Sequence, residues 1–384
     1  MKQARVAIVH DYLNQMGGAE RVVAVMHGMF AAAPIFTTIA DRGKLLPEMQ
    51  RADIRTTWMQ RIPGILRRFK FYFWLYPLAV RSLPLQDYDI ILSSSSAYAK
   101  AAAGQRAVHV CYCHTPMRFA WEFESYMEGM GVHPMLKRLA SWMMSPLRRW
   151  DVATSRRVDY FIANSTAVRE RIRRCYGRDA AVIYPPVATS RFSVSPEPPG
   201  GYYLIVSRLV SYKRLDLAVQ ACTRLGRRLV VIGDGPDRQR LESLAGPEVQ
   251  FLGRLPDDQV VGYMQRCRAL LFPGLEDFGI TPLEVNACGR PVIAFRGGGA
   301  LDTIQPGVNG LFFDEPSADS VAAAIERCEQ SEWDPGVIRA HACRFDQERF
   351  TAQLRCFIEE AVEKTAGHPA ASAAAPENGS AALL

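Results

Sequence analysis

Short runs of apolar and β-branched residues alternate with amphipathic stretches along most of the chain, and this rhythm constrains the fold more than any other feature. Such runs are typical of buried strands, and the 3.6-residue periodicity of the intervening stretches is typical of helices. Strands that alternate with helices form parallel sheets with helices on both faces. We expect strands at Arg5–His10, Tyr88–Ser94, Val108–Cys113, Tyr160–Asn164 and Ala180–Tyr184, and again at Tyr202–Ser207, Arg228–Ile232, Val249–Leu252, Ala269–Phe272, Pro291–Ala294 and Gly310–Phe313.

The rhythm breaks once, at Phe192–Gly201, where the Pro/Gly/Ser composition is typical of a linker. The 384 residues also exceed the roughly 150 that one domain commonly holds. The sequence therefore predicts an α/β fold with two Rossmann-like domains, at residues 1–190 and 200–344. A helix is expected over 345–364, crossing back to the first domain, because apolar residues recur with helical spacing between Gln347 and Lys364. Residues 366–384 contain few large apolar side chains and are expected to form a disordered tail.

Charge and cysteine content limit the partners and the compartment. Lys and Arg number 46 against 39 Asp and Glu, and the net charge of +7 favours phosphates, anionic lipids or nucleic acid as partners. Nine scattered cysteines without a C-x-x-C pair argue against a disulfide framework or a zinc ribbon. The apolar run Val6–Val9 is too short for a signal peptide, and Phe71–Val80 is too short to span a membrane. We therefore expect a cytoplasmic location.

Two segments of the first half, Ile65–Val80 and Met135–Trp150, mix cations with large aromatic and apolar residues. Such segments suit an anionic membrane surface, with aromatic rings at the headgroup level and basic groups on phosphate. They can equally be core helices whose cations snorkel to solvent. Of the two, we favour a peripheral position on the inner face of the cytoplasmic membrane.

Glycine-rich and basic turns follow the first strand of each half. Gly17 and Gly18 open a helix after the first strand, where backbone N–H groups and the helix dipole favour an anion. Arg208 and Lys213 follow the strand Tyr202–Ser207 and can hold a diphosphate, Arg by its planar fork and Lys as a point charge. Taken alone, each turn also fits an ordinary solvated loop.

Pro273 to Glu284 is the most informative stretch. Thr281, Pro282 and Glu284 have the spacing of a capping box, which predicts that the helix begins after Thr281 and that Glu276 lies on the preceding loop. The amides of Phe278, Gly279 and Ile280 would then gather near the positive end of the helix dipole. This arrangement can bind a polyhydroxylated anion. For Glu284 the simpler interpretation is helix capping, and for Glu276 it is a solvated charge.

His114 ends the strand Val108–Cys113 and can donate a hydrogen bond to a sugar hydroxyl, although a lone histidine is more often structural. Gly233 also follows a strand and supplies permissive backbone at the same edge. The sequence contains no H-E-x-x-H metal motif, no Walker A loop, no G-x-S-x-G elbow, and no G-x-G-x-x-G after the first strand. We expect neither a metal nor a cofactor.

In their order along the chain, these motifs resemble those of glycosyltransferase family four, the retaining enzymes with the two-domain GT-B fold facing a central cleft. The resemblance extends to about Lys364. It rests on Gly17-Gly18-Ala19-Glu20, Cys113-His114-Thr115-Pro116, Ser207-Arg208-Leu209 with Lys213, Gly233-Asp234-Gly235-Pro236, Phe251-Leu252-Gly253, and Glu276 through Glu284. The chain departs from the family at Asp277, where many members have Gly, and at Thr281, where many have a small or apolar residue.

The resemblance implies roles for the matching residues. Arg208 and Lys213 would hold the donor diphosphate, Glu276 would contact the transferred hexose, and Glu284 would contact the ribose. The amides around Phe278–Ile280 would hold the sugar or phosphates, His114 would donate to a sugar hydroxyl, and backbone near Gly253–Leu255 would read the base. Together with the turns described above, the expected catalytic residues are His114, Arg208, Lys213 and Glu276, and the expected donor-binding residues are Gly17, Gly18, Arg208, Lys213, Gly233, Leu255, Phe278, Gly279, Ile280 and Glu284.

Residues around Tyr112–Arg118 and Trp121-Glu122 look most like the mannosyltransferase-type enzymes of bacterial O-antigen and exopolysaccharide assembly. The expected reaction is retaining transfer of a hexose, with mannose from GDP-mannose as the best guess, to a polyprenyl-diphosphate-linked or other saccharide. The alternatives are a UDP-sugar donor or a GT-B nucleotide-sugar epimerase. A nucleic-acid partner is not expected, because no nucleic-acid-binding module is visible.

Overall fold

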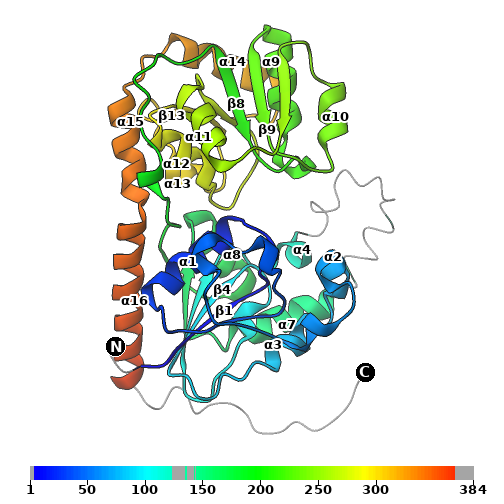
Figure 1. Ribbon diagram of the computed structural model, residues 1–384, viewed down its shortest axis with the longest axis vertical. Coiled ribbons are helices and arrows are strands. Elements are labelled where there is room, and N and C mark those ends of the chain that lie inside the picture. The colour runs from blue at the N-terminus through cyan, green and yellow to red at the C-terminus, as the bar shows by residue number, and fades with distance from the viewer. Residues whose placement is uncertain (1–3, 123–134, 136–141, 143, 368–384) are drawn as a thin grey trace.

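The computed structural model describes residues 4–122, 135, 142 and 144–367, and it contains two parallel sheets with helices on their faces (Figure 1). The first sheet has the strand order β3-β2-β1-β4-β5-β6-β7, and the second has the order β10-β9-β8-β11-β12-β13. In both sheets the order reverses beside the first strand, and ligands of doubly wound folds bind at that switch point. The predicted α/β fold with two Rossmann-like sheets is confirmed.

The first sheet consists of β1 (Val6–His10), β2 (Ile35–Thr37), β3 (Ile54–Thr56), β4 (Ile90–Ser95), β5 (Val108–Cys113), β6 (Tyr160–Ala163) and β7 (Ala180–Val182). The second consists of β8 (Tyr202–Val206), β9 (Arg228–Ile232), β10 (Val249–Gly253), β11 (Leu270–Phe272), β12 (Val292–Phe295) and β13 (Gly310–Phe313). Every strand predicted from the sequence is present. The prediction missed β2 and β3, which have three residues each and are too short to show a periodicity.

The helices that accompany the first sheet are α1 (Gly18–Met29), α2 (Ile65–Arg68), α3 (Tyr76–Arg81), α4 (Arg118–Trp121), α7 (Ser145–Ser155) and α8 (Thr166–Tyr176). Those of the second are α9 (Leu215–Leu225), α10 (Arg238–Ser243), α11 (Asp257–Arg266), α12 (Ile280–Ala287), α13 (Ala300–Thr303), α14 (Ala318–Gln330) and α15 (Pro335–Ala342). Across the described residues, no helix has both the length and the apolar character needed to span a bilayer.

The last helix, α16 (Gln347–Gly367), runs alongside the first sheet (Figure 1). Its buried residues Phe350, Leu354 and Ile358 join the core cluster that α1 and β1 also form, and the Phe350 ring meets Tyr112 of β5 edge to face at 5.7 Å. The helix reaches Gly367, so the first two residues of the expected tail are helical, because no helix breaker precedes Gly367. The rest of that tail, 368–384, lies outside the described residues.

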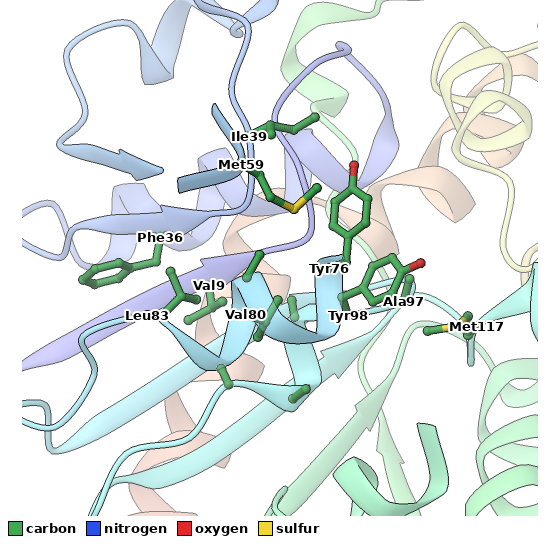
Figure 2. Close-up of a cluster of buried hydrophobic side chains, with 14 of the residues drawn as sticks. Val9, Phe36, Ile39, Met59, Tyr76, Val80, Leu83, Ala97, Tyr98 and Met117 are labelled. Atoms are coloured by element: carbon green, nitrogen blue, oxygen red, sulfur yellow. The ribbon is translucent and has the colours of Figure 1, made fainter. Parts of the chain in front are cut away.

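Another apolar cluster covers the opposite face of the first sheet (Figure 2). There Tyr76 of α3 stacks on Tyr98 with ring centroids 4.6 Å apart, and Val80 packs beside Val9 of β1. These contacts anchor α3 through its buried side. The opposite side of the helix is therefore free to face solvent.

Two chain crossings connect the halves and lie side by side. The Val187 amide donates to the Phe345 carbonyl at 2.9 Å, so the segment after β7 pairs with the segment before α16. Phe278, from the loop before α12, packs against Phe345 and stacks on Tyr184 at 5.7 Å. The loop that carries the predicted site is thus packed against the connection between the halves.

Candidate active site

The clearest cluster of predicted residues lies at the carboxyl ends of β8 and β11, which are neighbours in the second sheet. Lys213 Nζ lies 2.6 Å from Glu276 Oε1, and both side chains are mostly buried. Lys213 belongs to the turn after β8 and Glu276 to the loop after β11. A small pocket between these strand ends is lined by both residues. The structure therefore joins a cation and a carboxylate that are 63 residues apart (276 − 213).

Arg208 lies on the same turn and is exposed. Its Nη2 is 3.4 Å from the Tyr212 hydroxyl, and no ion pair with a described residue holds its guanidinium. The turn ends at Arg214, the N-cap of α9, whose φ of 49° is unusual for a residue with a side chain. Strained backbone of this kind is concentrated at functional sites.

Gly233 allows the turn after β8 to approach the end of β9. It has a φ of 128°, and a Cβ at this position would lie 1.8 Å from the Ser207 carbonyl oxygen. Only glycine fits there, so Gly233 helps to shape the turn that carries Arg208. Leu255 follows β10 and packs, half-buried, against the core of the second domain.

The capping box predicted at Thr281, Pro282 and Glu284 is wrong. Helix α12 begins at Ile280 with Gly279 as its N-cap, and no side chain caps it. Pro282 is tolerated in the first turn because the first N–H groups of a helix have no intrahelical partner. Gly279, with a φ of 85°, makes the turn into the helix.

Glu284 consequently has a different partner. Its Oε1 accepts from Arg21 Nη1 at 2.8 Å, a contact between α12 of the second half and α1 of the first. Burial raises the pKa of Glu284, and the charge of Arg21 partly offsets this rise. Arg21 was not among the predicted site residues. Its position four residues after Gly17, on the helix that the glycine turn opens, is the signal that could have found it.

The Gly17-Gly18 turn reaches the same region. A Cβ on Gly18 would lie 3.0 Å from Ile280 Cδ1, so this glycine of the first half packs against the first residue of α12. The Phe278 side chain points instead into the apolar contact between the halves, where it is 3% exposed. Phe278 can therefore contribute to the site only through its backbone amide and carbonyl.

His114 lies at the end of β5 and is buried. Its Nε2 is 2.8 Å from Ser94 Oγ at the end of β4. Burial, together with the nearby charge of His10, lowers the pKa of His114 to about 3. The imidazole is therefore neutral at physiological pH, the form in which one ring nitrogen donates and the other accepts.

Asp277, the position at which the chain departs from the family pattern, connects the halves. Its Oδ1 accepts a hydrogen bond from Arg171 Nη1 of α8, and Arg118 Nη2 lies 3.8 Å from the same oxygen. Arg171 also donates to the Thr115 hydroxyl, next to His114. Sequence reasoning gave neither arginine a role in the site: Arg118 was only the end of the motif Tyr112–Arg118, and Arg171 lies in no motif.

Two family models match the chain and together extend over residues 16–344. The model described as Glycosyltransferase Family 4 matches residues 16–191, and the one described as Glycosyl transferases group 1 matches residues 188–344. These family models, together with the curated relatives described below, identify a hexosyltransferase. The chain belongs to glycosyltransferase family 4.

Curated relatives are similar at modest identity. The human alpha-1,3/1,6-mannosyltransferase ALG2 is 26% identical over 375 residues, covering 84% of this chain and 86% of that protein. A Mycobacterium tuberculosis GDP-mannose-dependent alpha-(1-6)-phosphatidylinositol monomannoside mannosyltransferase is 32% identical, over 48% of this chain and 56% of its own length.

Solved structures share the fold. Anabaena HepE, in complex with UDP and glucose, aligns with a TM-score of 0.71 at 19% identity, covering 93% of this chain and all of that one. Sucrose-phosphate synthase from Thermosynechococcus elongatus aligns with a TM-score of 0.68 at 18% identity, over 94% of this chain. These likenesses support the two-domain GT-B architecture.

Proposed function

We propose that the protein transfers a mannosyl group from GDP-mannose, with retention at the anomeric carbon, to a lipid-linked saccharide acceptor during bacterial surface polysaccharide assembly. Relatives from two distant groups of organisms are named mannosyltransferases, and the mycobacterial one is named as GDP-mannose-dependent with a lipid-linked acceptor. The motif around Tyr112–Arg118 favours the same branch of the family.

The observation that carries the proposal is the paired Lys213 and Glu276 beside the exposed Arg208. When a donor binds, its diphosphate would take Lys213 as a partner and release Glu276. The freed carboxylate would then accept hydrogen bonds from hydroxyls of the hexose. The diphosphate and the hexose of the donor would thus each bind one partner of an ion pair that is already present.

The main contribution to the rate is neutralisation of the leaving diphosphate. Arg208, Lys213 and the N-terminal amides of α12 are the positive groups at this edge, and one such donor is typically worth about 3 kcal/mol of transition-state stabilisation. We propose that these groups supply the charge without a metal ion, so addition of a chelator should leave the transfer rate unchanged.

Glu284 would meet the ribose, as in the family. Its present partner Arg21 belongs to the first half, so a ribose hydroxyl that binds Glu284 would lie beside α1 and the Gly17-Gly18 turn. In this arrangement the donor is enclosed by loops from both halves, which excludes water from the reacting bond.

The acceptor would be presented at the membrane. Phe71, Trp74 and Leu78 are 80%, 43% and 60% exposed. They lie on the segment that packs against the first sheet through the buried side of α3. The exposed cations Arg67, Arg68 and Lys70 come from the same stretch. We propose that this surface, the aromatic-basic face, holds the protein on the inner face of the cytoplasmic membrane. Met135 and Trp142 are also exposed, while 136–141 and 143 of the second basic segment lie outside the described residues.

The test is a transfer assay with a panel of donors. Purified protein is incubated with GDP-mannose, UDP-glucose or UDP-galactose and vesicles containing a polyprenyl-diphosphate-linked saccharide, and the product linkage is determined by NMR. The proposal expects an α-linked product from GDP-mannose alone. An α-linked product from a UDP-sugar alone would establish the alternative donor, and epimerisation of the donor without any acceptor would replace transfer altogether.

A further inference from the structure

A buried chain of polar side chains leads from α1 to His114. Glu20 Oε1 lies 3.8 Å from His10 Nε2, His10 Nδ1 lies 3.1 Å from Ser94 Oγ, and Ser94 Oγ lies 2.8 Å from His114 Nε2. Glu20, His10 and Ser94 are 1%, 3% and 0% exposed. Buried polar groups of this kind are costly unless every proton has an acceptor, so their directions can be worked out.

The first proton is fixed by a backbone carbonyl. His10 Nδ1 lies 3.0 Å from the carbonyl oxygen of Ser94, which can only accept, so Nδ1 must carry the proton. On the other side of the ring, burial opposes ionisation, but the Glu20 carboxylate, 3.8 Å from Nε2, outweighs it and raises the pKa of His10. The same pairing lowers the pKa of Glu20 against the effect of burial.

The direction of the next bond follows from the first. Ser94 Oγ faces a proton on His10 Nδ1, so it cannot give its own hydrogen to that nitrogen. Its other side-chain contact among the described residues is His114 Nε2, and a buried hydroxyl hydrogen needs an acceptor, so we assign Ser94 as the donor to His114 Nε2. His114 is neutral, and a neutral ring whose Nε2 accepts must carry its proton on Nδ1. Edge-to-face packing of Tyr112 against His114, with centroids 5.2 Å apart, holds the ring in place. Among the described residues, none accepts a hydrogen bond from His114 Nδ1.

We propose that Glu20, His10 and Ser94 are positioning residues that hold His114 as the Nδ1–H tautomer and thereby leave a hydrogen-bond donor for the substrate. This inference rests on the proposed function for its purpose, since the ligand of Nδ1 would be a hydroxyl of the transferred sugar. None of the three residues needs to touch the substrate. The run Ser93–Ser96, at the end of a buried strand, is the sequence signal for this arrangement.

The first experiment measures the tautomer directly. Protein labelled with ¹⁵N-histidine is studied by two-bond ¹H–¹⁵N correlation NMR without any donor, and the His114 signals are assigned by their loss in His114→Asn. The proposal expects a protonated Nδ1 and an unprotonated Nε2 in the wild type at pH 7 to 8. A proton on Nε2, or an equal mixture of the two tautomers, would overturn it, whatever the variants do.

Two matched variants follow. Ser94→Ala should shift His114 toward the Nε2–H tautomer. Ser93→Ala, which removes an equally buried 2.8 Å Ser–His contact, to His109 Nε2, on the same strand, should leave the His114 signals unchanged. A folded Ser94→Ala protein with the wild-type His114 pattern would contradict the role of Ser94.

Kinetics then separate positioning from a structural effect. With the donor that the wild type uses, Ser94→Ala should lower kcat about tenfold while the donor KM changes by less than about twofold, because one transition-state hydrogen bond is weakened. Ser93→Ala should change neither. The NMR result does not use a donor, so failure of the proposed transfer reaction and failure of the tautomer assignment give different outcomes.

Discussion

Lys213 is the residue on which the donor site depends most. It is the partner of Glu276 in the present structure, and it would be the partner of the diphosphate during transfer. Removal of its ammonium group should therefore act on the rate more than on the fold. Lys213→Ala is expected to lose at least about tenfold in transfer rate, as measured with saturating acceptor. Arg228→Ala, at the opposite end of β9 in the same sheet, is the control and should transfer at the wild-type rate.

A second residue-scale prediction concerns acid stability. Burial lowers the pKa of His109 to about 4, whereas an unfolded chain has histidine pKa values near 6.5. Between these values the unfolded chain binds a proton that the folded protein does not, so folding is fully favoured above pH 6.5 and weakens as the pH falls toward 4. The wild type should lose about 1 kcal/mol per pH unit in this window through His109.

His109→Gln removes this proton linkage and should show a shallower decline. The measurement is the thermal unfolding midpoint of both proteins from pH 7 to pH 4. His114 and His10 are unchanged in the variant, so the difference between the two curves isolates His109. Parallel curves would show that His109 takes up its proton over the same pH range in the folded and the unfolded protein, and would contradict the lowered pKa.

Individual site residues differ in how far sequence could predict them. Arg208, Lys213 and Glu276 lie at strand ends, and the strand pattern alone brings them to one edge of a sheet. The partners of Glu284 and Asp277 depend on how α1 and α8 of the first half approach the loop before α12. No local pattern encodes that approach, so Arg171 was missed, and the one sequence signal for Arg21 is its place on the helix that the Gly17-Gly18 turn opens.

At the scale of elements, the start of α12 determines the shape of the site loop. Gly279 has a φ of 85°, and a Cβ there would lie 2.6 Å from Phe272 Cζ at the end of β11. Gly279→Ala is therefore strained in both backbone and packing, and we expect it to destabilise the protein by about 2 kcal/mol and to weaken nucleotide binding.

Gly28→Ala is the matched control. Gly28 lies within α1 with nothing within 4 Å of its Cβ position, so alanine should be neutral or stabilising by up to about 1 kcal/mol. Thermal unfolding of the two variants makes the comparison. Equal midpoints would show that the turn into α12 accepts a side chain.

Element prediction succeeded where the hydrophobic signal was long. Val108–Cys113 and Arg228–Ile232 have the predicted bounds, whereas β2 and β3, with three residues each, were too short to show a periodicity. The capping box at Thr281 failed for a different reason. Its spacing was correct, but Gly279 already makes the helix entry two residues earlier, and Glu284 is bound to Arg21.

At the scale of the whole molecule, the aromatic-basic face determines which side of the protein would meet a membrane. The helices α2, α3 and α7 lie on the side of the first sheet's domain away from α16 (Figure 1). If this face meets an anionic membrane, flotation with anionic vesicles should recover the protein and flotation with neutral vesicles should not. Phe71→Ser combined with Trp74→Ser should weaken vesicle binding about tenfold, because apolar area is lost from the interface.

Val337→Ser removes an exposed apolar side chain, 49% exposed, from α15 in the other half, and should bind vesicles like the wild type. Recovery that is equal with neutral and anionic vesicles would contradict the membrane assignment. It would leave the assignment of Arg208, Lys213 and Glu276 untouched, since these residues follow strands of the second sheet.

The central claim is that the turn after β8 and the loop after β11 form a nucleoside-diphosphate-sugar site. Calorimetric titration of GDP, UDP and ADP into the wild type, Arg228→Ala and the double variant Arg208→Ala/Lys213→Ala tests it most directly. The account predicts micromolar binding of GDP to the wild type and to Arg228→Ala, and its loss in the double variant. Equal GDP binding by the double variant would contradict it, since the diphosphate would then be held elsewhere.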